Sequence, residues 1–261
     1  MRTELGRKLS TQLYGALETV VVKGTDRLPF VKPDMNDIVA RVDTLSRHTL
    51  KLNAPTDFFD SRLQMDVLDW VAKEHTRKAQ LVAMGSGASS GTIGLPGLAI
   101  DAPILVATTV GLVRRHALIY GFTEIEDQRG EALPLLMALG ASVGAEFAID
   151  RITPRFAEKI GVDVGTALVE RFLMKRISEQ LAAKIIVSWL PRAVPIIGAA
   201  TSAALNYGFL SVIGRQSSRH YREQHTLVRR QLQSSDADLA SILAERQTRP
   251  SPPNEIVIDP E

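Results

Sequence analysis

The chain has 261 residues, enough for one large domain or two small ones, with 45% hydrophobic residues, 23% charged residues and no cysteine. Because cysteine is absent, disulfides, thiol catalysis and cysteine-ligated zinc are excluded. The net charge of +2 and the aromatic content of 5% are too low for a nucleic-acid-binding surface of cations and stacking rings.

Residues 1–55 are expected to form an N-terminal helical region, without the apolar stretch of a secretory signal. Asp34 or Asn36 can cap a helix in this region, and the Asn-Ala-Pro sequence that closes the region should stop that helix. Thr56 or Asp57 is expected to open the next helix. Helical spacing places the following apolar residues on buried faces: Leu9, Leu13, Leu17, Val20, Ile38, Val39, Val42, Leu45, Leu50, Leu63, Val67, Leu68, Trp70 and Val71.

Residues 85–121 form a glycine-rich apolar block whose only carboxylate is Asp101. The glycines and serines at its start predict a turn. Asp101, followed by Ala-Pro, is the predicted N-cap of a helix that ends at Tyr120, with Gly121 at its C-terminal stop. The uncharged part of this helix is shorter than the ~20 residues that a bilayer span needs, so we expect a re-entrant or a buried hairpin.

Two alternative interpretations assign a nucleophile or a ligand to the start of this block. Residues 87–91 match the G-x-S-x-G pattern of a nucleophile elbow, and Ser86, Ser89 or Asp101 would then act with a histidine in a serine-type hydrolase. The glycines also resemble loops that bind dinucleotide phosphates. Both interpretations require strands that the sequence does not signal, so we expect no catalytic residue, no cofactor and no metal site.

The second half of the chain alternates apolar and polar segments. Residues 132–145 predict an apolar helix, and residues 166–189 predict a long amphipathic helix. An apolar block at 194–214 is followed by a basic polar helix at 215–245 and by a disordered tail at 246–261. The face of the amphipathic helix carries Leu168, Phe172, Leu173, Ile177, Leu181, Ile185 and Ile186.

The block at 194–214 is the better candidate for a membrane span, because it carries no charge over its whole length. Its small residues, among them Gly198, permit close approach of another helix. Asn206 would need a hydrogen-bond partner in lipid or in a dry core, and we interpret it as a packing contact.

Two segments of the chain resemble the signatures of a known family, EcsC. The central signature of that family is similar to GTIGLPGLAIDAPILVATTVGLVRRHALIYGF, and its second signature is similar to VPIIGAATSAALNYGFLSVIGRQSSRHY. Both occur in the expected order, and the resemblance extends over about residues 60–225. The residues that carry it are our candidate functional or structural positions: Gly94, Pro96, Gly97, Asp101, Tyr120, Gly121, Pro195, Gly198 and Asn206.

The resemblance implies an all-α helical bundle with two Gly/Ala-rich apolar hairpin segments, an EcsC-like domain at 56–245, and no established reaction. The family takes its name from an operon that also encodes an ABC transporter, and similar patterns occur in some bacterial membrane-associated GTPases. Our leading hypothesis is therefore a bacterial protein at the cytoplasmic face of the inner membrane that contacts lipid or a membrane protein, with homo-oligomers left open. The alternative is a soluble helical interaction module that acts through residues 215–261.

Overall fold

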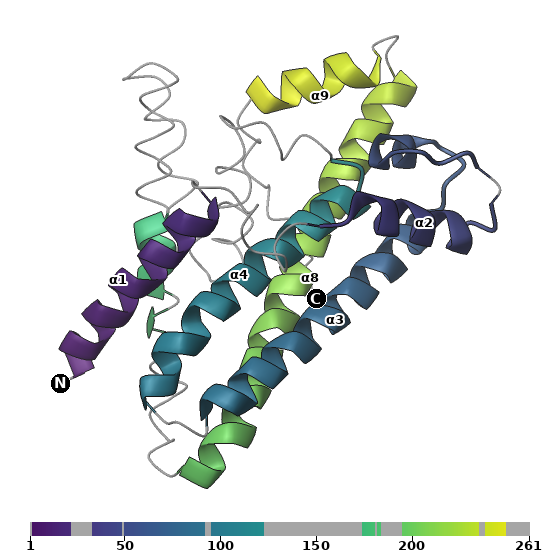
Figure 1. The fold of residues 1–261 in the computed structure, drawn as a ribbon. Helices are drawn as coiled ribbons and strands as arrows, with labels where there is room; N and C mark the ends of the chain where they lie inside the picture. Colours follow the sequence, from purple (N-terminus) through teal and green to yellow (C-terminus); the bar gives the residue numbers. More distant parts are fainter. Residues whose placement is uncertain are drawn as a thin grey trace, which may run out of the picture.

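The computed structural model describes residues 2–21, 33–48, 50–91, 95–122, 174–180, 182–183, 195–234 and 238–248. All regular structure in these ranges is helical, which confirms the all-α prediction (Figure 1). The elements are α1 (Arg2–Val21), α2 (Met35–Leu45), the 3-10 helix η1 (Pro55–Phe59), α3 (Met65–Gly91), α4 (Leu95–Ile119), α8 (Pro195–Ser234) and α9 (Leu239–Thr248).

The centre of the molecule is a bundle of α3, α4 and α8, with α1 packed on α4 and α2 on α3 (Figure 1). Three contacts show that α3 and α8 are antiparallel: Asp69 meets Arg222, Thr76 meets Gly214, and Ala83 meets Asn206. Residues of α3 and α8 therefore pair at successive levels along the bundle.

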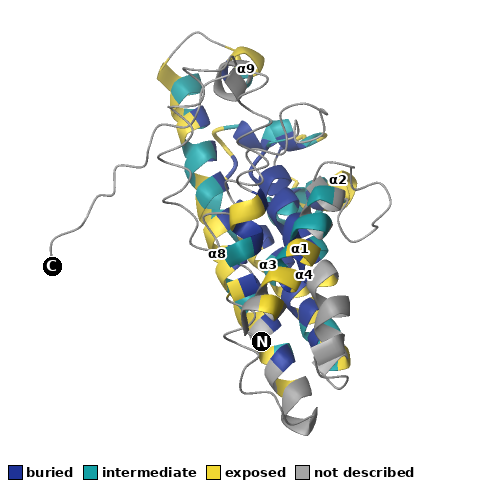
Figure 2. Ribbon diagram, turned by 90° about the vertical axis from the view of Figure 1, so that its left-hand side faces the viewer, coloured by how far each residue is buried: buried dark blue, intermediate teal, exposed yellow. Residues whose placement is uncertain are grey.

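The core lies around α4, whose described side chains are mostly buried from Leu105 to Ile119 (Figure 2). A helix that is apolar on nearly all sides has to be enclosed by other elements, and here α1, α3 and α8 enclose it. The largest fully buried side chains are Tyr120, Phe58, Leu13, Ile38, Leu68, Leu112 and Ile119.

Local signals fix the beginning of α2 as the sequence predicts. The Asp34 carboxylate accepts hydrogen bonds from the backbone N–H groups of Asn36 (2.9 Å) and Asp37 (3.3 Å), which satisfies two free donors of the first turn. The prediction for Thr56 and Asp57 is wrong, because both lie in η1 and α3 begins only at Met65. The Asp57 carboxylate instead accepts from the N–H groups of residues 53 and 54 and so holds a tight turn.

The predicted turn at the start of the glycine-rich block is also wrong, since residues 85–91 are the last turns of α3. Serine is tolerated there because its hydroxyl can bond to a carbonyl of the preceding turn. Ser86 donates to the carbonyl of Ala83 (3.2 Å), and Ser89 donates to that of Gly85 (3.0 Å).

Asp101 does not cap α4, because this helix begins at Leu95 and has already made more than one turn at residue 101. Pro96 accounts for the earlier start. The N–H groups of the first turn have no acceptor within the helix, so a proline loses no hydrogen bond there, and its fixed φ suits a helix. Pro103, expected in the first turn, therefore lies inside the helix.

The apolar block at 194–214 and the first part of the predicted basic helix are one element, α8. A separate helix, α9, follows and includes the first residues of the predicted tail. Among the helices of the described ranges, none combines the length and the apolar character needed to cross a bilayer. The predicted helix at 132–145 lies outside the described residues, and of the one at 166–189 only 174–180 and 182–183 are described, as helix.

Candidate functional site

The end of α4 is closed by the Tyr120–Gly121 pair that the sequence singles out. The N–H of Gly121 donates to the carbonyl of Leu118 (3.0 Å), and the N–H of Phe122 donates to that of Ala117 (2.9 Å). These are the two hydrogen bonds of a Schellman motif, which requires a left-handed residue at its C′ position. Gly121 supplies that residue with a φ of 93°.

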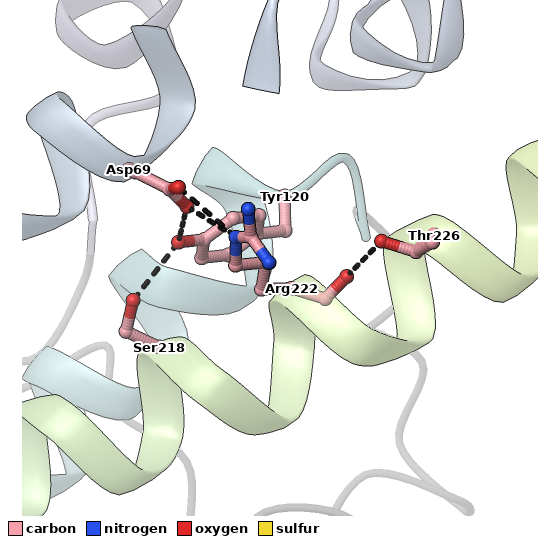
Figure 3. A network of polar contacts seen from close by, with 5 residues as sticks. All are labelled: Asp69, Tyr120, Ser218, Arg222 and Thr226. Atoms are coloured by element: carbon pink, nitrogen blue, oxygen red, sulfur yellow. Dashed lines mark hydrogen bonds and ion pairs between the residues drawn. The ribbon is translucent and has the colours of Figure 1, made fainter. Parts of the chain in front are cut away.

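The Tyr120 side chain joins all three central helices through a polar cluster, which we define as Asp69, Tyr120, Ser218 and Arg222 (Figure 3). The Tyr120 hydroxyl donates to Asp69 Oδ1 (2.8 Å) and lies 2.9 Å from Ser218 Oγ. Arg222 Nε lies 3.1 and 3.0 Å from the two Asp69 oxygens. Burial raises the pKa of Tyr120, which keeps its hydroxyl protonated as a donor.

His225 and Phe59 contact the backbone of the same junction, at Tyr120 and at Gly121. His225 Nδ1 lies 2.8 Å from the carbonyl oxygen of Tyr120, so this nitrogen carries the proton and donates. The imidazole stacks on the Phe59 ring with centroids 4.6 Å apart. Phe59 in turn packs against Gly121, where a Cβ would lie 2.7 Å from the ring.

A second buried contact joins the helices around His116. Its Nε2 lies 3.2 Å from the carbonyl oxygen of Ala72 and 3.1 Å from Thr76 Oγ1, and its Nδ1 lies 2.6 Å from Ser217 Oγ. The carbonyl can only accept, so Nε2 donates to it and Nδ1 accepts from the serine hydroxyl. His116 and Ser217 are fully buried, and no carboxylate of the described residues contacts the imidazole.

This geometry argues against the nucleophile elbow. The elbow needs a strand before its serine and a helix after it, whereas Ser86 and Ser89 both lie inside α3. The serine that a described histidine contacts is Ser217, which is fully buried beside His116 and closed to a substrate. The dinucleotide-loop interpretation fails in the same way, because residues 85–91 form no loop. Within the described ranges, no cluster of three or more metal-ligating side chains occurs.

Asn206 makes the packing contact that the sequence predicts. Its Nδ2 donates to the carbonyl of Ala83 (3.1 Å) on α3. The approach of the two helices is close because α3 has Gly87 at this level, where a Cβ would lie 2.7 Å from Asn206 Nδ2 and 2.9 Å from the carbonyl oxygen of Ser202. Gly87 of the glycine-rich block therefore serves helix contact rather than a ligand loop.

We predict opposite effects for two neighbouring glycines of α3. Gly87→Ala should lower the free energy of unfolding by about 1–2 kcal/mol, because the clash with the α8 backbone outweighs the gain in helix propensity. Gly85→Ala, exposed and with nothing within 4 Å of the new Cβ, should raise it by about 0.5–1 kcal/mol. Urea unfolding followed by circular dichroism measures both, and a stabilised Gly87→Ala variant would contradict the close approach.

The three central helices bring their apolar segments to one end of the bundle, at the bottom of Figure 1. This apolar end comprises residues 79–91 of α3, 95–113 of α4 and 195–214 of α8, and Asp101 is the only formal charge in these segments. Several large apolar side chains are exposed on it: Leu81, Val82, Ile104, Tyr207 and Val212.

Cations mark the level at which the apolar end stops. Thr76, His116 and Gly214 meet at this level of the bundle, through the Thr76–His116 contact and the packing of Gly214 on Thr76. The residues next to them in the chain are arginines, at positions 77, 115 and 215. We refer to these three arginines as the cationic collar. The collar marks the boundary between the apolar end and the charged parts of α3 and α8.

The structure joins Tyr120 and Gly121 in one junction and places Asn206 in another contact, 12 residues before Ser218 along α8. Gly94 lies outside the described residues. Pro96, Gly97 and Asp101 are residues of α4, and Pro195 and Gly198 are residues of α8, but the surroundings of their side chains lie outside the described part. Sequence analysis missed Asp69, Ser217, Ser218 and Arg222, since isolated polar residues on amphipathic helices carry no signal of a distant partner.

Comparison with curated proteins and with solved structures found no match. The EcsC protein family matches residues 18–225, well over half of the chain and including α3, α4 and most of α8. The chain belongs to the EcsC protein family.

Proposed function

We propose that this protein associates with the cytoplasmic face of a bacterial inner membrane by placing its apolar end in the lipid interface. The observation that carries the proposal is the gathering of three almost uncharged helix segments at one end, with large apolar side chains exposed there. Exposed apolar residues that cluster at one end of a charged protein mark a surface that contacts a membrane or a partner. No reaction is part of the proposal.

The distribution of charge supports lipid as the contact. An inserted end needs a boundary at which cations meet the headgroups, and the cationic collar lies at that level on all three helices. The small residues of α3 and α8 keep the inserted helices closely packed, as the Gly87–Asn206 contact illustrates. A membrane protein could contact the same surface, and the experiment below separates the two partners.

Flotation of the purified full chain with lipid vesicles tests the proposal. The wild-type protein should float with the vesicles without any protein partner. The variant Leu81→Glu/Val212→Glu places one carboxylate on α3 and one on α8 in the apolar end, and each change should lower the vesicle affinity at least about tenfold through lost apolar burial.

The matched control is Trp70→Glu/Leu227→Glu, which adds the same two charges to exposed apolar positions of α3 and α8 beyond the collar. It should bind vesicles like the wild-type protein. A wild-type protein that stays with the soluble fraction, or equal loss in both variants, would reject lipid as the partner. Complete release by carbonate washing of membranes from expressing cells would exclude stable insertion.

A further inference from the structure

One side of the α3–α8 pair carries cations that have no acidic partner among the residues that the structure describes. The Asp69–Arg222 contact fixes which edges of the two helices face each other (Figure 3). From Asp69, steps of one helical turn along α3 reach Lys73, Arg77 and Leu81, all exposed. One edge of a helix is followed by such steps of three or four residues.

The matching edge of α8 runs in the opposite direction from Arg222. Steps of three or four residues reach Ser218, then Arg215, Ser211 and Tyr207. Because α3 and α8 are antiparallel, both edges proceed from the Asp69–Arg222 pair towards the apolar end. The order is the same on each helix: cations first, then a large exposed apolar residue, Leu81 on α3 and Tyr207 on α8.

We define Lys73, Arg77 and Arg215 as the cationic face. No carboxylate of the described residues lies within 4 Å of any of the three, and the Arg215 Nε contacts only the carbonyl of Ser211, at 3.4 Å. The neighbouring cations differ in this respect. Lys78 pairs with Glu74 (3.1 Å), and Arg219 pairs with Glu223 (2.8 Å).

We propose that the cationic face binds the phosphate groups of anionic phospholipids while Leu81 and Tyr207 contact the adjoining apolar part of the leaflet. The proposal rests on the membrane association proposed above and adds the class of lipid. Cations without an acidic partner keep their charge available for phosphate, and each basic residue near an anionic surface contributes to binding. One helical turn, about 5.4 Å, separates Arg77 from Leu81, a spacing that lets one lipid contact both.

The test compares two variants that each lose one cation from α3 and one from α8. Arg77→Gln/Arg215→Gln removes two members of the cationic face, whereas Lys78→Gln/Arg219→Gln removes two cations that already have carboxylate partners. The net charge changes equally in the two variants, so the difference between them reports position. Circular dichroism and urea unfolding verify that both fold.

Flotation is measured with vesicles of phosphatidylcholine alone and of phosphatidylcholine mixed with phosphatidylglycerol. The wild-type protein should prefer the anionic vesicles. Because each basic residue contributes about a fivefold gain on such a surface, Arg77→Gln/Arg215→Gln should lower that affinity about 25-fold. Its binding to phosphatidylcholine should not change, and the loss in Lys78→Gln/Arg219→Gln should be several times smaller.

Equal losses in the two variants would overturn the inference, since net charge alone would then explain the preference. Equal binding of the wild-type protein to both kinds of vesicle would also overturn it, while membrane association itself would stand. If the wild-type protein binds neither kind, membrane association fails and the inference fails with it.

Discussion

Lowering the pH from 7 to about 5 is expected to destabilise this protein strongly, because three histidines are buried in the neutral form. Burial lowers the pKa of His116 from 6.5 to about 3, and it lowers the pKa values of His75 and His225 to about 4. In the unfolded chain each imidazole takes up a proton near its ordinary pKa. The stability that depends on neutral histidine is therefore complete above pH 6.5 and is lost as the pH falls towards the folded pKa values.

The surroundings of each ring show why protonation is costly. Nε2 of His75 and Nε2 of His225 are buried and have no hydrogen-bond partner among the described residues, so an added proton would have no acceptor. Lys78 and Arg115 lower the pKa of His75 further, and they outweigh Asp37 and Glu74, which raise it.

The pKa values of His116 and His225 are also set by opposing effects. His116 already donates to the carbonyl of Ala72, which raises its pKa, while burial, His75 and Arg115 lower it. For His225, burial and Arg229 lower the pKa, and the Tyr120 carbonyl and Asp69 raise it. In both cases burial has the largest effect.

The free energy of unfolding should fall by up to about 1.4 kcal/mol per pH unit for each histidine that titrates. Between pH 6.5 and 5 three such residues together remove up to about 6 kcal/mol, which is comparable with the lower end of the stability of a domain, about 5–15 kcal/mol. Urea unfolding at a series of pH values between 7 and about 5 measures the slope.

Two variants identify the histidines as the cause. His225→Gln keeps a donor for the Tyr120 carbonyl and removes one titrating group. The slope of the free energy of unfolding against pH should therefore fall by about 1.4 kcal/mol per pH unit. Gly85→Ala, which removes no titratable group, should leave the slope unchanged. A stability that stays constant from pH 7 to about 5 would refute the prediction.

Gly121→Ala is expected to lower the free energy of unfolding by about 2–5 kcal/mol, from two independent costs. A left-handed φ costs a residue with a Cβ about 1–2 kcal/mol, and Gly121 has a φ of 93°. The new Cβ would also lie 2.7 Å from the Phe59 ring and 3.1 Å from the carbonyl oxygen of Pro55, and such crowding costs about 1–3 kcal/mol.

Gly208→Ala is the matched control, because Gly208 lies inside α8 with open space around its Cα. Alanine at this position should raise the free energy of unfolding by about 0.5–1 kcal/mol. Urea unfolding measures the free energy of unfolding of both variants. A Gly121→Ala variant as stable as the wild-type protein would show that the Phe59–Gly121 contact is not part of the folded state in solution.

The positions that the sequence predicts correctly depend on interactions within one or two helical turns. Asp34 caps α2 through the N–H groups of the next residues, and Gly121 ends α4 through carbonyls three and five positions earlier. Asn206 is predicted to need a partner because a buried amide must be hydrogen-bonded wherever it lies. Its actual partner, the carbonyl of Ala83, could not be predicted from spacing.

The wrong predictions lie where local preference and tertiary contact disagree. Glycine and serine at 85–91 favour a turn locally, yet α3 continues because Gly87 gains a close contact with α8. Asp101, followed by Pro103, has the sequence of a helix cap, but Pro96 provides an equally good helix start seven residues before Pro103.

The sequence by itself determined the helical class, the membership of the EcsC protein family, the stop at Gly121 and the segregation of charge along the chain, because each of these follows from residue types or from neighbours within a few positions. Only the tertiary structure decided that the apolar segments meet at one end and that Tyr120 joins Asp69 and Arg222. Asp69 lies 51 positions from Tyr120 and 153 positions from Arg222, so these contacts depend on how the helices pack. Packing depends on the shapes of whole helix faces, which no short window of sequence contains.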